Sequence, residues 1–354
     1  MALGPDPSGL EPRHPDADSP EERRSEDMLR LILRRLASAV LVLLLASVVI
    51  FTVISVSGDP LAELRDRQPP VPESVIAAEE ARLGLHDPLP MRYLTWLSGV
   101  VTGDFGPSTI ATRDIGAELG TRVGVTLRLV LIAIIIALVL SLLAGTVSAL
   151  YQRRWPDLVL TPSAFVLLAL PSFWLAVLLK QWGIGLNNLT GYQLFYTVGE
   201  ASVPRPEGFA LVADIGGHLV LPTIVLALVH FATWSRYQRT AVAEGLAGDH
   251  VRFAVLKGLS RRRIIGSYVV RPALIPIVTI VALDLPVVFS GAVITETVFQ
   301  WRGMGGFLLE SIALRDTNAV LAWLLIAATA VVIFNLLADI LYGVVDPRVR
   351  YAKS

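Results

Sequence analysis

Long apolar stretches, separated by polar and often basic connections, dominate this sequence. About 20 apolar residues are enough for a helix to cross the roughly 30 Å hydrocarbon layer of a bilayer. Six segments meet that requirement, and we predict a spanning helix in each: residues 30–56, 123–150, 158–183, 217–235, 268–295 and 319–345. The pattern therefore predicts an all-α membrane protein with six transmembrane helices.

Internal prolines interrupt three of the predicted spans. They are Pro162 and Pro171 in the third, Pro222 in the fourth, and Pro272, Pro276 and Pro286 in the fifth. Such breaks persist in a membrane where neighbouring helices or a wet cavity satisfy the freed backbone groups. Two interpretations remain open: a bundle that lines a path, or kinked packing alone.

Arginine and lysine predict the orientation. Basic residues flank the first span, follow the second and sixth, and crowd the connection between the fourth and fifth. All these positions fall on one side of the membrane, which the excess of positive charge in cytoplasmic loops makes the cytoplasmic side. The sequence thus predicts a multi-pass protein of the cell membrane with both termini in the cytoplasm.

The same reading divides the chain. We expect a disordered cytoplasmic tail over residues 1–28, which lack the apolar core of a signal peptide, and a first transmembrane helix over 29–56. An extracytoplasmic segment follows over 57–122, with a polar helix at Glu73–Leu83 and an interfacial helix at Met91–Val101 that places Tyr93 and Trp96 at the headgroups. A core over 123–347 and a cytoplasmic tail over 348–354 complete the chain.

The basic loop over residues 236–266 contains a short amphipathic helix. Asp249 is suited to cap its start, and Gly258 to end it in the left-handed conformation. Val251, Ala254, Val255 and Leu259 fall on one face at helical spacing. A small apolar face on the cytoplasmic side predicts a docking site for a soluble partner.

Composition narrows the chemistry. The chain has 354 residues, 54% of them hydrophobic, no net charge and no cysteine, so nothing suggests a nucleic-acid partner and disulfides are excluded. Its three lysines, Lys180, Lys257 and Lys353, do not follow a glycine, which excludes a phosphate-binding Gly-Lys-Ser/Thr loop. No pair of histidines has metal-ligand spacing, and we interpret the glycine-rich stretch Gly303–Gly306 as a turn. The sequence predicts no catalytic residue, cofactor or metal in this chain.

Asp284 is the acidic residue that lies well inside a predicted span. A charge at that depth usually faces a bundle interior or a wet cavity. A residue of a translocation pathway and a carboxylate that pairs with another helix are equally compatible with this position. An intramembrane hydrolase remains the alternative from the enzyme class, but Asp284 has no evident second carboxylate.

Motifs along the whole chain resemble one family of transport proteins. They include Gly58-Asp-Pro60, Leu83-Gly-Leu-His-Asp-Pro-Leu-Pro90, Gly103-Asp-Phe-Gly106, Leu170-Pro-Ser-Phe173, Gly291-Ala-Val-Ile-Thr-Glu-Thr-Val-Phe299, Trp301-Arg-Gly-Met-Gly305 and Asp346-Pro-Arg348. The loop Asp249-His-Val-Arg-Phe-Ala-Val-Leu-Lys-Gly-Leu259 resembles the EAA loop of the same proteins. Together they resemble the B-type permease subunits of dipeptide, oligopeptide and nickel ABC importers, most of all actinobacterial oligopeptide permeases.

This resemblance implies a fold, partners and a mechanism. The fold is the MetI-like transmembrane domain of type I ABC importers. The partners are a second, homologous C-type permease, two ABC ATPase subunits that bind ATP and Mg²⁺, an extracytoplasmic substrate-binding protein and a peptide substrate. The EAA loop docks on the ATPase; here it implies coupling roles for Asp249, Val251, Arg252, Ala254, Val255, Lys257, Gly258, Leu259 and Arg261. In the loop, His250, Phe253, Val255 and Leu256 depart from the commoner residues of the family.

Overall fold

The computed structural model describes residues 20–57, 59, 61–110 and 112–345, and within them the chain is helical without a strand. The longer helices are α1 (Pro20–Val56), α5 (Ile115–Leu150), α6 (Trp155–Ala169), α7 (Ser172–Thr190), α8 (Phe209–Ala247), α11 (Arg271–Phe299) and α13 (Thr317–Val345). The shorter elements are α2 (Ala62–Arg65), α3 (Glu73–Arg82), α4 (Leu89–Thr102), α9 (Asp249–Leu256), α10 (Arg261–Arg263), the π-helix η1 (Ile264–Val270) and α12 (Met304–Ala313).

Five helices in this part of the chain are long and apolar enough to cross a membrane, or six if the bent pair α6 and α7 forms one span. The prediction of an all-α membrane protein is confirmed. The prediction of disorder over residues 1–28 is wrong for its last part, because α1 begins at Pro20. Residues 1–19 and the predicted C-terminal tail lie outside the described residues.

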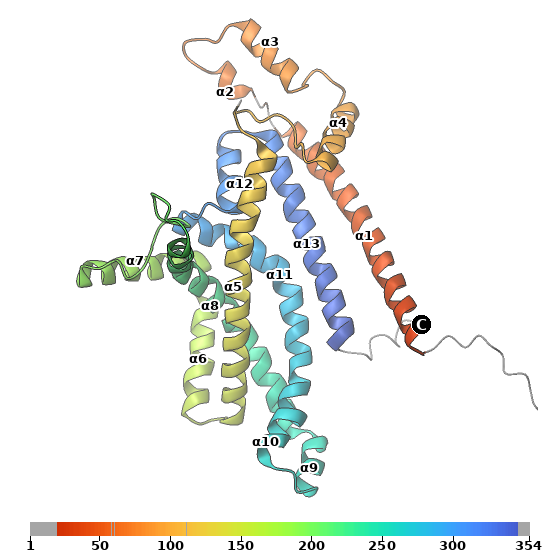
Figure 1. The fold of residues 1–354 in the computed structure, drawn as a ribbon, viewed down its shortest axis with the longest axis vertical. Coiled ribbons are helices and arrows are strands. Elements are labelled where there is room, and N and C mark those ends of the chain that lie inside the picture. The colour runs from red at the N-terminus through yellow and green to blue at the C-terminus, as the bar shows by residue number, and fades with distance from the viewer. Residues whose placement is uncertain (1–19, 58, 60, 111, 346–354) are drawn as a thin grey trace, which may run out of the picture.

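The predicted third span does not run straight. Helix α6 ends at Ala169, Leu170 is extended, and α7 continues from Ser172 at an angle of 107°. Pro171 explains part of this break, because a proline disfavours helical geometry at the residue before it. Figure 1 shows α7 projecting sideways from the bundle, whereas α5, α6, α11 and α13 run along its length.

The core lies where α5, α8 and α11 meet. Leu129, Ala133 and Ala137 of α5 pack with Trp234 of α8 and Ile277 of α11, all at most 1% exposed. A second apolar cluster joins the first turns of α5 to α12 and α13. Side chains on the outside of these helices stay apolar and exposed, as expected for a surface that faces lipid.

The two ends of the bundle differ. Helices α2, α3 and α4 lie at one end, whereas α9 and α10 lie at the other (Figure 1). In α4, Trp96 is 7% exposed and packs on Phe51 of α1, and the Tyr93 hydroxyl lies 2.9 Å from the Ser47 hydroxyl. Both rings therefore attach α4 to α1, and their position at the headgroups stays a prediction. The predicted polar helix is confirmed as α3.

A polar contact holds α3 against the connection between α4 and α5. Arg82 donates to the carboxylate of Glu79 and, over 2.7 Å, to the carbonyl oxygen of Ser108. The hydrogen bond from Arg82 holds the pKa of Glu79 below its usual range, because it favours the ionised carboxylate.

Candidate functional site

Helix α9 is the short helix expected in the basic loop. It covers Asp249–Leu256, and Gly258 follows with φ of +70°. The amide of Leu259 donates to the carbonyl of Ala254 over 3.2 Å, which closes the helix end. The predicted left-handed conformation of Gly258 at the helix end is confirmed. The predicted cap is wrong: Gly248 occupies the cap position, and Asp249, in the first turn, pairs with Arg252 over 3.2 Å.

The apolar side chains of α9 lie on two different sides. Ala254 is 2% exposed, and Val251 packs against a buried cluster of the bundle that includes Val242 and Val269. In contrast, Phe253, Val255 and Leu256 are 63%, 59% and 82% exposed. The predicted docking face is therefore wrong in part, since Val251 and Ala254 serve the chain's own packing. We call the exposed side chains of Phe253, Val255 and Leu256 the free face of α9; Phe253 and Leu256 lie one turn apart on it, and Val255 lies at its border with Val251.

Exposed basic residues lie close in the chain to the free face. Arg252 and Lys257 are exposed beside it, and Arg261, Arg262 and Arg263 are exposed in α10. Leu259 is half-buried between the two helices. Exposed apolar side chains among basic residues fit a protein partner with an apolar groove and acidic edges.

An ion pair ties α8 to the start of α6, near the same end of the bundle. Asp157 of α6 accepts from Arg239 Nε at 2.8 Å and from its Nη2 at 3.0 Å. Asp157 is 6% exposed and also accepts from the Ser148 and Thr161 hydroxyls and the Arg153 amide. The last part of α8, which leads into α9, is therefore held to both α5 and α6. The sequence alone does not predict the Asp157–Arg239 ion pair, because its two residues are 82 positions apart.

Asp284 lies between α8 and α11. Its Oδ2 accepts a hydrogen bond of 2.6 Å from the indole Nε1 of Trp234, and the His230 ring lies 5.3 Å from the Trp234 ring. Asp284 itself is half-buried, and its neighbours Leu283 and Val287 are more than 60% exposed. The carboxylate thus pairs with another helix and also reaches a surface of the bundle.

A buried carboxylate that sequence reasoning gave no role lies near the end of α11. Glu296 is fully buried; it accepts from the Thr126 hydroxyl of α5 and from the Gly305 amide over 2.6 Å. Gly303 leaves room for it, because a Cβ there would lie 2.2 Å from Glu296 Oε1. The stretch predicted as a turn instead begins α12, whose first amides favour a negative charge.

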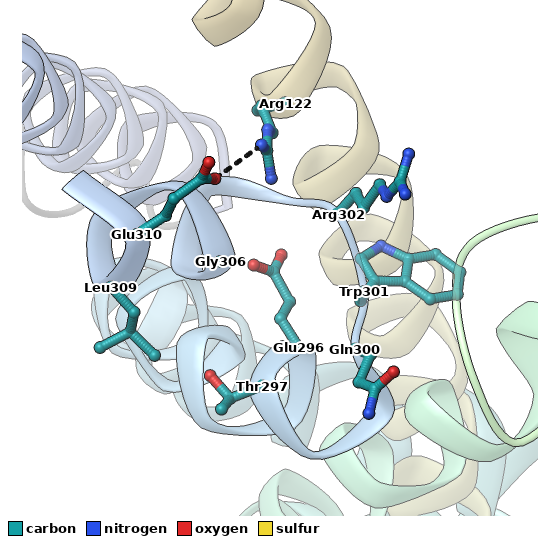
Figure 2. A pocket seen from close by; sticks show the side chains of 9 residues that line it. All are labelled: Arg122, Glu296, Thr297, Gln300, Trp301, Arg302, Gly306, Leu309 and Glu310. Atoms are coloured by element: carbon teal, nitrogen blue, oxygen red, sulfur yellow. Dashed lines mark hydrogen bonds and ion pairs between the residues drawn. The ribbon is translucent and has the colours of Figure 1, made fainter. Parts of the chain in front are cut away.

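A cavity of about 440 Å³ opens beside this carboxylate. Figure 2 shows Glu296 pointing between α11 and α12, with the ion pair Arg122–Glu310 on one side and Trp301 and Arg302 on the other. The charges that line the cavity are paired or mixed in sign. In the part of the chain that the structure describes, no three His, Asp or Glu side chains group closely enough to hold a metal.

Comparison with known families decides the membership of the chain. The profile of the binding-protein-dependent transport system inner membrane component matches residues 139–351. The profile of its N-terminal part matches residues 28–113. The chain belongs to this family. It is therefore a multi-pass transport subunit of the inner-membrane permease type.

Three permease proteins similar to this chain support its membership of the same family. The oligopeptide transport system permease protein OppB of Mycobacterium tuberculosis is 39% identical over 324 residues, which cover 91% of this chain and 99% of that protein. The dipeptide permease DppB of Alkalihalophilus pseudofirmus is 32% identical, over 92% of this chain and all of that protein. The glutathione permease GsiC of Salmonella choleraesuis is 30% identical over the same shares. The chain is thus a B-type permease subunit of an ABC importer, and the predicted family and fold class are confirmed.

Proposed function

We propose that this permease subunit translocates peptides, with oligopeptides ahead of dipeptides. The support is the order of identity among its relatives, in which an oligopeptide permease at 39% precedes a dipeptide permease at 32% and a glutathione permease at 30%. Nickel chelates are a further candidate from the wider family. Selection among these ligands rests largely with the separate binding protein.

The proposed complex has three kinds of partner protein. A second, homologous C-type permease completes the translocation path within the lipid bilayer, and two ATPase subunits bind ATP and Mg²⁺ below it. A substrate-binding protein delivers the ligand above. Both termini of this chain and α9 lie in the cytoplasm, and α2–α4 lie outside, in line with the arginine-rich connection around α10.

Coupling is assigned to α9, which we call the coupling helix. The observation that carries this assignment is the free face of Phe253, Val255 and Leu256, three exposed apolar side chains among exposed basic residues at one end of the bundle. We propose that the free face enters a groove of an ATPase subunit, while Asp249, Arg252, Lys257 and Arg261 contact its edges. Movement of the ATPases then reaches the spans through the inner face of α9, Val251 and Ala254.

Substitution on the free face tests this assignment. Leu256→Asp places a charge at the most exposed apolar position of α9 and should release the ATPase subunits during co-purification, with uptake lost. Val75→Asp makes the same change at an exposed position of α3, at the other end of the bundle, and should keep them. Full retention of the ATPases by the Leu256→Asp permease would overturn the docking role of α9.

The ligand is tested with the complete complex in liposomes. Trialanine, dialanine, glutathione and a nickel–histidine chelate are each delivered by the binding protein while ATP hydrolysis is measured. Trialanine should stimulate hydrolysis most. A stronger response to glutathione or to the chelate would contradict the proposed peptide substrate without affecting the role of α9.

A further inference from the structure

One side chain of the coupling helix is attached directly to the backbone of the next span. His250, the second residue of α9, has its ring Nε2 3.0 Å from the carbonyl oxygen of Tyr268 in η1. A carbonyl only accepts, so Nε2 carries the hydrogen and donates it. The π-helix η1 continues without a gap into α11, the helix that carries Asp284.

Pro272 removes one amide that could compete for the Tyr268 carbonyl. In an α-helix this carbonyl would accept from the amide of the residue four positions later, which is Pro272, and a proline has no amide hydrogen. The wider π turn over Ile264–Val270 lies directly before this proline. The backbone at the base of α11 therefore offers an acceptor to a side chain from elsewhere, and His250 occupies it.

Gly248 provides the room that the His250 ring needs. A Cβ at position 248 would lie 2.4 Å from Cε1 and 2.6 Å from Nδ1 of His250. Such contacts are too short for any side chain to coexist with the ring in its present place. His250 donates the hydrogen bond to Tyr268, and Gly248 leaves the space that the His250 ring needs to do so.

We propose that His250 is a positioning residue that fixes the coupling helix to α11 through the Tyr268 carbonyl. Val251 and Ala254 hold the inner face of α9 by packing, which resists separation but leaves the helix free to slide. The directional hydrogen bond sets the register of α9 against η1, so a push on the free face moves α11 with it. This inference rests on the proposed docking of α9.

Three substitutions and one control distinguish the effect of the hydrogen-bond donor from the effect of the aromatic ring at position 250. His250→Phe keeps an aromatic ring without a donor, and His250→Gln keeps an N–H at a similar reach. Gly248→Ala displaces the ring, whereas Gly266→Ala adds the same methyl in the same loop where nothing lies within 4 Å. Each variant is prepared as the complete complex in liposomes, with the ligand of the above panel that stimulates hydrolysis most.

The measurement is the amount of ligand taken up per ATP hydrolysed. A hydrogen bond of ordinary net strength predicts that His250→Phe and Gly248→Ala lower this ratio about three- to tenfold. The ATPases should stay bound and hydrolysis should continue. His250→Gln should restore most of the ratio, and Gly266→Ala should leave it unchanged. The double variant Gly248→Ala/His250→Phe should be no worse than either single variant, because both remove one contact.

The result that overturns the proposal is an unchanged ratio in His250→Phe, or additive losses in the double variant. Either could occur while Leu256→Asp still releases the ATPases, and the docking role of α9 would then stand without this contact. Retention of the ATPases by Leu256→Asp would instead refute the docking role itself. The two failures are therefore distinguishable.

Discussion

At the scale of single residues, the backbone conformation of Gly258 strongly restricts which residue can stand at this position. Its φ of +70° lies in the left-handed region, where a β-branched residue is strained, and no atom lies within 4 Å of where its Cβ would be. The constraint is therefore one of backbone conformation and not of space. Side chains that tolerate the left-handed region should be accepted at this position.

Gly258→Val should distort the end of α9 and turn its free face away from the ATPase. The strain is on the order of 1–2 kcal/mol, enough to weaken ATPase retention about tenfold. Gly258→Asn is the matched control, since asparagine visits this region readily and should retain the ATPases. Co-purification and uptake check both variants. Equal behaviour of the valine and asparagine variants would contradict the conformational argument.

Asp284 combines a charge with a hydrogen bond, and two substitutions separate these properties. Asp284→Asn removes the charge but keeps an oxygen that can accept from Trp234 Nε1, so uptake should fall while the complex still assembles. Trp234→Phe removes the donor and leaves the charge, so it should lower assembly or thermal stability instead. Loss of assembly in Asp284→Asn would show that the carboxylate serves packing.

At the scale of elements, the break between α6 and α7 illustrates what apolar pattern misses. Residues 158–183 read as one span because hydrophobicity continues through Leu170 and Pro171. Hydrophobicity shows that a segment avoids water, but it does not show the direction in which the helix runs. The bend of 107° therefore cannot be predicted from the apolar pattern. The proline was a local signal for a break, but prolines also occur in kinked spans that continue.

The ion pair Asp157–Arg239 fastens two elements, and its loss should affect them together. Arg239→Gln leaves Asp157 with its hydroxyl and amide donors but without the cation, at a cost of about 1–3 kcal/mol. We expect a lower midpoint of thermal unfolding in detergent. Arg239→Lys, which keeps the cation beside Asp157, should lower the midpoint less than Arg239→Gln. An unchanged midpoint in Arg239→Gln would show that the pair adds no stability.

At the scale of the whole molecule, orientation is the property that most needs a direct test. The chain has no cysteine, so a single introduced thiol gives an unambiguous signal. Ser74→Cys in α3 and Ser260→Cys beside α10 are both at exposed positions. An impermeant maleimide added to intact cells should label the first and not the second. Labelling of Ser260→Cys from outside would reverse the proposed topology.

Sequence alone predicted the fold class and the position of α9, because span length and helical spacing are local properties. It also predicted the left-handed conformation of Gly258, because a glycine at a helix end is by itself a signal for that conformation. It did not predict which face of α9 is free, since that depends on Val242 and Val269 from other helices. Nor did it find Glu296, whose partners Thr126 and Gly305 come together only when α5, α11 and α12 pack.

The contacts of Asp157 also bear on how the chain enters the membrane during synthesis. Ser148, the Arg153 amide and Thr161 all belong to the hairpin of α5 and α6, whereas Arg239 emerges later from the ribosome. The carboxylate therefore has three donors within its own hairpin while α8 is still unmade. A nascent chain that stops at Gly208 should integrate α5 and α6 as a stable pair, and α8 then joins a hairpin that already holds its acceptor in place.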